Sequence, residues 1–477
     1  MNWRSKSSVI APLAVCGLLA GWIVLSVANA RAIGFSIFVF VVANLIVYTD
    51  ALDFALRLYM RRHHTLAAGG AYGRSSGNLS VNLSAILPPD ARRVVPAPSF
   101  AIIASIFNLE DRLDDFMDAF GPYRHRVWLI SDGSTDHTVL RLREAGWRCF
   151  DDGVNRRKPA ALRRLLASLP AHIDIVMVID PDVRIRGLKE GSTIDVEEFV
   201  GDFQQSGAAA ACPKIMIEPD GLLGRFQAFE YALAFRVGRE SLADFSVTSG
   251  VSFYRRNALA RALDEHSLSV YAEDFENALI LLSHGERIYY DGRLVVSTEG
   301  PGSLQHWFSQ RVGWYHGLIK VYSERFSEVL RISRRSPFAT YNYLIYIGGL
   351  GLAIHLVKIV SAALLLLSFL GGLGTMVLDD FVPQSTLGNP EYFIAALGSY
   401  LALGVVALFT CVSKSERAYV APIVPLYLCY ALTHIVPMTV GFGNFFALRL
   451  FRRRIYQDHY ESPADLAIPM QKAEPIE

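Results

Sequence analysis

The 477-residue chain is poor in charged residues and in cysteine. Asp, Glu, Lys and Arg make up 19% of it, against roughly 25% in an average soluble domain, whereas 52% of its residues are hydrophobic. The net charge of +1 excludes a bulk electrostatic field that attracts nucleic acid. The five cysteines form no C-x-x-C pair, which argues against a zinc site and a disulfide framework. This composition indicates a membrane protein whose soluble part lies in a reducing compartment.

Two apolar runs near the N-terminus have the length of membrane spans. Runs 9–28 and 32–48 are separated by a short connection, which favours a retained helical hairpin. A cleaved signal peptide is the alternative for the first run, because residues 28–30 are Ala-Asn-Ala. Basic residues follow within 57–64 and predict that this side is cytoplasmic. The hairpin is expected to occupy residues 1–64, and a Gly-, Ser- and Pro-rich linker residues 65–98.

A second apolar block covers residues 341–450. Its candidate spans are 341–378, 392–412 and 419–440, with a short segment at 442–450. The basic tail 451–477 belongs in the cytosol, so either 341–378 is a hairpin or the last block crosses twice. The preceding segment, 301–340, is expected to form interfacial helices. Its arginines are expected to touch anionic headgroups: Arg325, Arg331, Arg334 and Arg335.

Residues 99–300, between the two blocks, have the pattern of a cytosolic α/β domain. Apolar runs 99–107, 126–131 and 173–179 predict strands, and helical patterns such as 111–120 and 158–168 alternate with them. This alternation predicts a mostly parallel sheet, whose ligands bind at the carboxyl ends of the strands. Each run is followed by a polar residue at that end: Asn108, Asp132 and Asp180.

Two acidic motifs follow predicted strands. Asp132, in Ser-Asp-Gly-Ser-Thr-Asp, offers a carboxylate to a base or a ribose, and an ordinary strand–turn–helix corner is the alternative. Asp180 and Asp182 lie two residues apart and suit Mg²⁺ or Mn²⁺ together with phosphate oxygens. A solvated acidic turn is the commoner meaning of a lone D-x-D.

Three further motifs stand at predicted helices. Glu273 and Asp274 precede a helical run, where a carboxylate can serve as general base or merely cap the helix. Lys158 opens another helix and can pair with phosphate or remain solvated. Trp307 and Trp314 can stack on a sugar or base, or belong to an interfacial aromatic belt.

In their order, these motifs resemble those of the family-2 glycosyltransferases with the GT-A fold. The resemblance is strongest to the membrane-embedded branch that includes cellulose, chitin and hyaluronan synthases, and it covers about residues 99–314. It implies a GT-A-type α/β domain with a Rossmann-like mixed sheet, joined to an α-helical transmembrane region. The matching residues are Asn108, Glu110, Asp132, Asn155, Lys158, Leu162, Asp180, Asp182, Gly250, Glu273, Asp274, Gln310 and Trp314.

The resemblance also implies roles for the donor site and the base. Asp132 would contact the nucleobase, while Asp180 and Asp182 would hold the sugar diphosphate, Asp182 through the metal ion. Asp274 would be the catalytic base, next to Glu273.

On the acceptor side, the resemblance implies that Ser249 and Gly250 line the site. Gln310 and Trp314 would close over the diphosphate and the acceptor. The family's arginine in Q-x-x-R-W falls at Gly313, and Arg311 is the candidate substitute.

The function implied is an inverting, metal-dependent transfer of a sugar from a nucleoside diphosphate, with a UDP-sugar favoured. The acceptor is a glycan or a lipid-linked sugar, and the location is a bacterial-type inner or plasma membrane. In the leading form, a processive synthase elongates a polysaccharide and passes it through its own helices. The alternatives are a single transfer to a lipid-linked acceptor and a non-catalytic membrane scaffold or transporter.

Overall fold

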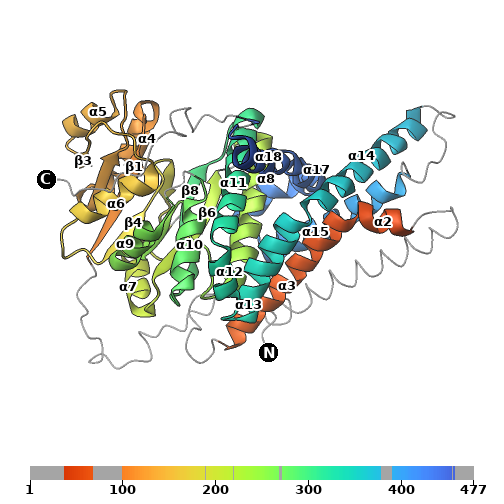
Figure 1. Ribbon diagram of the computed structural model, residues 1–477, viewed down its shortest axis with the longest axis horizontal. Coiled ribbons are helices and arrows are strands. Elements are labelled where there is room, and N and C mark those ends of the chain that lie inside the picture. The colour runs from red at the N-terminus through yellow and green to blue at the C-terminus, as the bar shows by residue number, and fades with distance from the viewer. Residues whose placement is uncertain are drawn as a thin grey trace.

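The computed structural model describes residues 37–67, 99–188, 190–218, 220–267, 271–377, 389–453 and 455–456. The expected span at 9–28 lies outside these residues, as does the expected linker 65–98 except for its first three residues, which continue a helix that ends at Ala67. An α/β domain occupies one side of the molecule, and long helices from both ends of the chain occupy the other (Figure 1). The described part therefore has the two-part organisation that the clustering of apolar residues predicts.

One mixed sheet of eight strands forms the α/β domain, in the order β3-β2-β1-β4-β7-β6-β8-β5. The strands are β1 (Phe100–Ile106), β2 (Val127–Ser131), β3 (Cys149–Phe150), β4 (Ile175–Val178), β5 (Val183–Ile185), β6 (Ala210–Glu218), β7 (Ser252–Arg255) and β8 (Ile288–Glu299). The pairs β1–β2, β1–β4, β2–β3 and β6–β8 are parallel. The pairs β4–β7, β6–β7 and β5–β8 are antiparallel. The mixed α/β sheet is confirmed, and β5 and β7 make it less parallel than the simple alternation of elements predicts.

Helices cover the faces of this sheet (Figure 1). They are α4 (Leu113–Phe120), α5 (Thr138–Glu144), α6 (Lys158–Ser168), α7 (Val196–Ser206), α8 (Gly221–Leu233), α9 (Arg256–Glu265) and α10 (Glu273–Ser283). Short turns of helix are η4 (Glu110–Arg112), η5 (Gly121–Arg126), η6 (Ala234–Arg239) and η7 (Glu240–Leu242). In α4, the buried residues Leu113, Phe116 and Phe120 recur at helical spacing, so one face of the helix packs on the core.

The remaining helices form the apolar part of the molecule. They are α2 (Ile37–Ala43), α3 (Leu45–Ala67), α11 (Leu304–Glu324), α12 (Phe326–Ser333), α13 (Pro337–Ala339), η8 (Thr340–Ala353), α14 (His355–Val377), α15 (Glu391–Thr410), α16 (Lys414–Val420), η9 (Ala421–Leu426), α17 (Tyr427–Thr433) and α18 (Ile435–Phe451). Within the described residues, three helical stretches are long and apolar enough to cross a membrane: His355–Gly374, Glu391–Thr410 and Lys414–Phe451. The expected segment 442–450 is the end of α18 rather than a separate helix.

Buried polar contacts join the helical part to the sheet domain. Arg57 of α3 pairs with Asp53 and donates hydrogen bonds to the carbonyl of Gly238 and to Asn342 of η8. Lys214 of β6 lies 3.2 Å from Glu416 of α16. The two parts are thus connected by specific ion pairs as well as by apolar packing.

Candidate active site

The carboxyl ends of three central strands meet at one edge of the sheet. Ile106 of β1 is in register with Ser131 of β2, and Ile103 of β1 with Val178 of β4. The polar residues that follow these strands therefore lie along the same edge. This is the position at which ligands bind in open α/β sheets.

Asp132 anchors the loop that precedes α6. Its carboxylate accepts a 2.6 Å hydrogen bond from the backbone N–H of Arg156. A Cβ on the next residue, Gly133, would lie 2.7 Å from the backbone nitrogen of Asn155, so only glycine allows the loop to approach. Burial raises the pKa of Asp132, and the N–H groups of Arg156 and Arg157 partly oppose this. The Asp132 carboxylate and the close approach at Gly133 therefore hold the loop that leads into α6.

Asn108 and Glu110 brace the same corner from the end of β1. The side-chain oxygen of Asn108 accepts a 2.8 Å hydrogen bond from the backbone of Thr135. Glu110 accepts one from the backbone of His137 and contacts its ring nitrogen Nδ1 at 3.0 Å. Both side chains are thus used to hold the loop that carries Asp132.

Lys158 joins two acidic motifs that are far apart in the sequence. Its ammonium group lies 2.5 Å from Asp180 Oδ1 and 2.6 Å from Glu273 Oε1. The contacts to Asp180 and Glu273 raise the pKa of Lys158 well above its usual value, even though burial favours the neutral form. The lysine is therefore a fixed cation between the D-x-D turn and the N-terminus of α10.

Gly250 packs directly against Asp180. In the antiparallel β4–β7 ladder Val178 faces Ser252, so continuing the same register brings Asp180 opposite Gly250. A Cβ on Gly250 would lie 2.0 Å from Asp180 Oδ2. Ser249, beside it, is buried and donates its hydroxyl to the carbonyl of Val251 at 2.8 Å. The structure thus brings Gly250 to the carboxylate cluster and turns the hydroxyl of Ser249 inward.

Asp274 stands in the first turn of α10, beside Glu273. The pKa of Asp274 is raised to about 6, mainly by burial and also by the Glu273 carboxylate, while Arg239 and Lys158 oppose the rise. One carboxylate oxygen accepts a 2.8 Å hydrogen bond from the backbone of Phe275, so Asp274 also caps the helix as the alternative interpretation predicts. A carboxylate with a pKa near neutrality is nevertheless matched to the task of a general base.

The D-x-D carboxylates have the chemistry of a divalent-cation site that needs phosphate to complete it. Asp182 accepts a 2.8 Å hydrogen bond from Thr298, and the pKa of Asp180 is raised to about 6 by burial, with Lys158 opposing and Asp182 adding to the rise. Within the described residues, no group of three or more His, Cys, Asp or Glu side chains is placed to hold a metal by itself. Mg²⁺ usually takes one or two carboxylates plus substrate phosphates, which is the donor set offered here.

Helix α11 carries the Gln310–Trp314 segment. Arg311 is buried, lies 2.9 Å from Glu230 of α8 and stacks on Trp314 at 4.2 Å from its ring centre. Trp314 is 39% exposed. The side-chain oxygen of Gln310 is buried and has no hydrogen-bond partner among the described residues. Arg311 is therefore held by Glu230 and by the ring of Trp314.

Tyr271 explains why position 313 is glycine. A Cβ on Gly313 would lie 2.4 Å from the ring of Tyr271, and one on Gly317 would lie 2.8 Å from its backbone carbonyl carbon. Residues 313 and 317 share one face of α11, so the segment before Glu273 lies in a groove of small residues. This packing places α11 beside the segment that leads to Glu273 and Asp274. The ring of Tyr271 occupies the space that an arginine side chain at position 313 would need.

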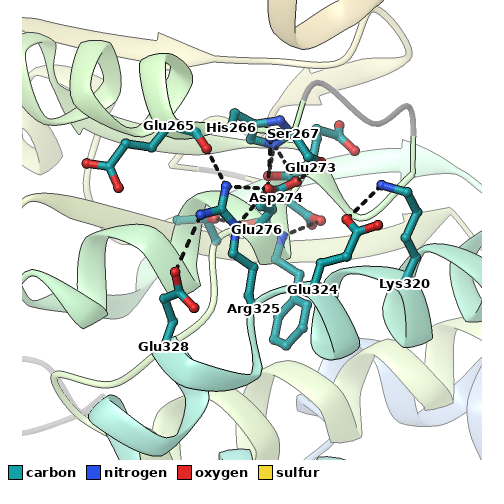
Figure 2. A network of polar contacts seen from close by, with 12 residues as sticks. Glu265, His266, Ser267, Glu273, Asp274, Glu276, Lys320, Glu324, Arg325 and Glu328 are labelled. Carbon is teal, nitrogen blue, oxygen red and sulfur yellow. Dashed lines mark hydrogen bonds and ion pairs between the residues drawn. The ribbon is translucent and has the colours of Figure 1, made fainter.

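A buried polar network holds α10 to the junction of α11 and α12 (Figure 2). Glu276 of α10 accepts hydrogen bonds from Ser267 at 2.6 Å and from Arg325 at 2.8 Å. His266 lies 3.5 Å from Glu276 and contacts the carbonyl oxygen of Glu273 at 3.2 Å. Burial acts to raise the pKa of Glu276, but these partners outweigh it and lower the pKa. The network fixes the helix whose first turn carries Asp274.

Replacing Arg325 by methionine is expected to lower the free energy of unfolding by about 3 kcal/mol, because the Glu276 side chain is only 1% exposed and would lose its cation. Thermal unfolding of the purified protein in detergent measures the loss. Arg331→Met is the matched control, since Arg331 is exposed on the neighbouring helix and has no ion pair among the described residues. Equal melting temperatures for the two variants would contradict this account.

Three non-glycine residues close to the candidate site residues have strained backbone conformations. Asn108, Arg157 and Ala272 have φ angles of 47°, 75° and 60°, a region that non-glycine residues seldom adopt. Each lies within two residues of a candidate site residue: Glu110, Lys158 and Asp274. Such strain persists only where the surrounding structure enforces it, and it is commonest at functional sites.

The sequence did not predict the residues that contact and position the candidate site residues and the helices that carry them. These are Glu230, Tyr271, Glu276, His266 and Arg239. Arg239 donates to the carbonyl of Thr248, whose hydroxyl in turn donates to the carbonyl of Asp274 at 2.5 Å. The spacing of Gly313 and Gly317 on a helix was the one signal that pointed to a packed neighbour. The others have no local signature.

No protein-family model and no curated protein matches the chain. Similar solved structures include glucosyl-3-phosphoglycerate synthase from Mycobacterium tuberculosis with phosphoglyceric acid: 18% identity, 47% of this chain and 79% of that chain covered, TM-score 0.33. The same enzyme with Mn²⁺ and UDP-glucose matches at 18% identity, the same coverage and a TM-score of 0.31. At these values, function has to be argued from the side chains at the sheet edge.

Proposed function

We propose that the chain is a membrane-bound glycosyltransferase, which moves a sugar from a nucleoside-diphosphate sugar to an acceptor hydroxyl. The observation that carries this is Lys158, whose ammonium group binds both Asp180 and Glu273. Three motifs that are spread over 115 residues of sequence thereby converge on one point. A fixed cation, two D-x-D carboxylates and a base of raised pKa are the parts that transfer from a sugar diphosphate requires.

In the proposed reaction, the acceptor oxygen attacks the anomeric carbon of the donor as the bond from that carbon to the diphosphate oxygen breaks. Asp274 takes the proton of the acceptor hydroxyl, and the nucleoside diphosphate leaves with the electron pair. This single displacement inverts the anomeric centre and needs no covalent intermediate. Lys158 lies where it can pair with the negative charge that develops on the diphosphate.

Asp180 and Asp182 would hold Mg²⁺ or Mn²⁺ against the diphosphate, where the cation would neutralise the leaving group. Asp132, braced by Asn108 and Glu110, would face the nucleobase of the donor, with UDP favoured. Gln310 and Trp314 would close over the bound donor and acceptor, since the buried oxygen of Gln310 has no hydrogen-bond partner in the described part of the chain and the ring of Trp314 is exposed. Gly250, and Ser249 through its backbone, would shape the acceptor side.

The leading form of the proposal is a processive polysaccharide synthase with its α/β domain in the cytosol. Direct packing of α11 on the apolar helices favours it, because Trp307 donates a hydrogen bond to Tyr430 of α17 at 3.2 Å. A single transfer to a lipid-linked acceptor is the second form, favoured by Tyr271 in the place of the family's arginine. The length of the product separates the two, and products of one added sugar would exclude the synthase.

A donor screen tests the proposed function. With Mg²⁺ or Mn²⁺, the purified protein is expected to release nucleoside diphosphate from one nucleotide sugar of a panel, and chelation of the metal should stop the release. Asp182→Ala should lower the rate about 100-fold, because the cation contributes several kcal/mol to the transition state. Asp118→Ala, on the exposed face of α4, is the control. Absence of both turnover and nucleotide binding for every donor would overturn the proposal.

A further inference from the structure

A pocket of about 620 Å³ lies at the junction of α12, α13 and η8. Leu330, Pro337 and Leu344 form its apolar walls. Ser333, Arg334 and Arg335 supply its polar lining. None of the residues assigned to sugar transfer lines it. The volume corresponds to about twenty water molecules, well beyond what a single small ion fills.

The polar lining has unused capacity to bind an anion. Among the described residues, no carboxylate lies within ion-pair distance of Arg334 or Arg335. Arg335 is fixed by hydrogen bonds to the carbonyl oxygens of Gly285 and Glu286, and its charge is shared with the Asp244 carboxylate and the ring of Phe245, so Arg334 is the arginine left for a ligand. Ser333 is 94% buried, and its hydroxyl has no hydrogen-bond partner among the described residues. A buried hydroxyl without a partner is costly, so a ligand that bonds to it would be stabilised.

The pocket also lies at the point in the chain where a segment rich in charged residues ends and an apolar segment begins. Residues 336–354 contain no Asp, Glu, Lys or Arg, and they lead into the candidate span His355–Gly374. At the start of η8, Tyr341 donates a hydrogen bond to Asp53 of α3, and α3 then continues to the basic residues Arg61 and Arg62. Figure 1 shows α13 beside this end of α3. A change from basic to apolar residues on two adjacent helices marks a membrane boundary.

We propose that this pocket binds the headgroup of one anionic phospholipid. The phosphate would pair with Arg334 and accept a hydrogen bond from Ser333. The glycerol and the first methylenes of the acyl chains would lie against Leu330, Pro337 and Leu344. A free phosphate ion would use Arg334 but leave these apolar walls exposed to water, so the lipid is the occupant that matches the whole lining. Of the four arginines expected at headgroups, Arg325 is engaged by Glu276, and the pocket selects Arg334.

Native mass spectrometry of the full-length protein in a neutral detergent tests the proposal, with phosphatidylglycerol as the probe. Wild-type protein is expected to retain one phosphatidylglycerol that an equal concentration of phosphatidylcholine does not displace. Arg334→Gln should weaken this binding about fivefold, the effect of one basic residue at an anionic surface. Leu344→Gln should also weaken it. Arg331→Gln, one turn earlier and outside the pocket, should leave it unchanged.

Equal losses in Arg334→Gln and Arg331→Gln would overturn the proposal, because they would show diffuse electrostatic attraction rather than a site. Displacement of the lipid by an equal concentration of inorganic phosphate would assign the pocket to a free anion instead. Melting temperatures of the variants exclude unfolding as the cause of lost binding, and the Arg334 side chain is exposed, so its removal should leave stability intact. The readout does not depend on sugar transfer.

Discussion

Replacing Asp274 by asparagine should lower the rate of sugar transfer about 100- to 10,000-fold, the usual contribution of a positioned general base. The amide keeps the shape of the carboxylate and can still accept the hydrogen bond from the backbone of Phe275, so the first turn of α10 should stay intact. Donor affinity should therefore change little. Measuring turnover and nucleotide binding on the same preparation separates the two effects.

Glu324→Gln is the matched control for Asp274→Asn. Glu324 lies in the last turn of α11 and pairs with Lys320 at 3.0 Å on the surface (Figure 2). An exposed pair of this kind contributes little to stability, so turnover should match that of the wild type. If Asp274→Asn kept full turnover, Asp274 would be a helix cap and the chemistry would need another base. If the wild-type protein and both variants bound nucleotide but showed no turnover, the alternative of a non-catalytic scaffold would gain support.

The pH dependence of turnover gives a second check on the same residue. Asp274 must be ionised to accept a proton, and burial together with Glu273 raises its pKa to about 6. The rate should accordingly be level above this pH and fall at least tenfold per unit below it, because the protonated fraction of Asp274 is inactive. In Asp274→Asn, the residual rate should fall less steeply with acid, and the limb that remains reports Asp180, whose pKa burial also raises to about 6.

The strands and the polar residues at their ends were predictable because they are local features. Apolar runs that end in Asn108, Asp132 and Asp180 form β1, β2 and β4, and parallel pairing then brings their ends to one edge. Lys158 begins α6, as the helical pattern predicts, and Glu273 begins α10, two residues before the helical run expected there. In these cases, hydrophobic periodicity within a short window carries the information.

Contacts between distant segments were not predictable in the same way. The Asp180–Gly250 contact depends on the antiparallel register of β4 and β7, which no single strand encodes. Arg311 meets Glu230 and Arg325 meets Glu276 across 81 and 49 residues, respectively. Tertiary packing alone selects these partners from many carboxylates of equal local propensity.

Backbone strain was equally invisible in the sequence. A glycine in the sequence often indicates a turn that needs a positive φ, and Gly133, beside Asp132, is such a case. Arg157 and Ala272 also have positive φ angles, without such a signal, immediately before Lys158 and Glu273. The cost of each is of order 1–3 kcal/mol and has to be offset by packing elsewhere. Such residues become apparent only when the fold that enforces their conformation is known.

Gly250→Ala is expected to lower turnover about 100-fold. The new Cβ would lie 2.0 Å from Oδ2 and 3.1 Å from Cγ of Asp180, so the carboxylate would have to move by roughly 1 Å or more. That movement would break its 2.5 Å contact with Lys158 and displace the D-x-D turn from the diphosphate. A shift of about 1 Å at reacting groups can cost about 100-fold in rate. Turnover at saturating donor and metal measures the effect.

Two further variants make this prediction specific to the Asp180 contact. Gly302→Ala, for which no atom lies within 4 Å of the added Cβ, should keep the turnover of the wild type. In a background of Asp180→Ala, the collision is already relieved, so Gly250→Ala should add little to the loss that Asp180→Ala causes alone. Independent losses that multiply in the double variant would show that Gly250 acts through another neighbour. A double variant as active as Asp180→Ala alone would establish that glycine is required at 250 because Asp180 occupies the space where a side chain would lie.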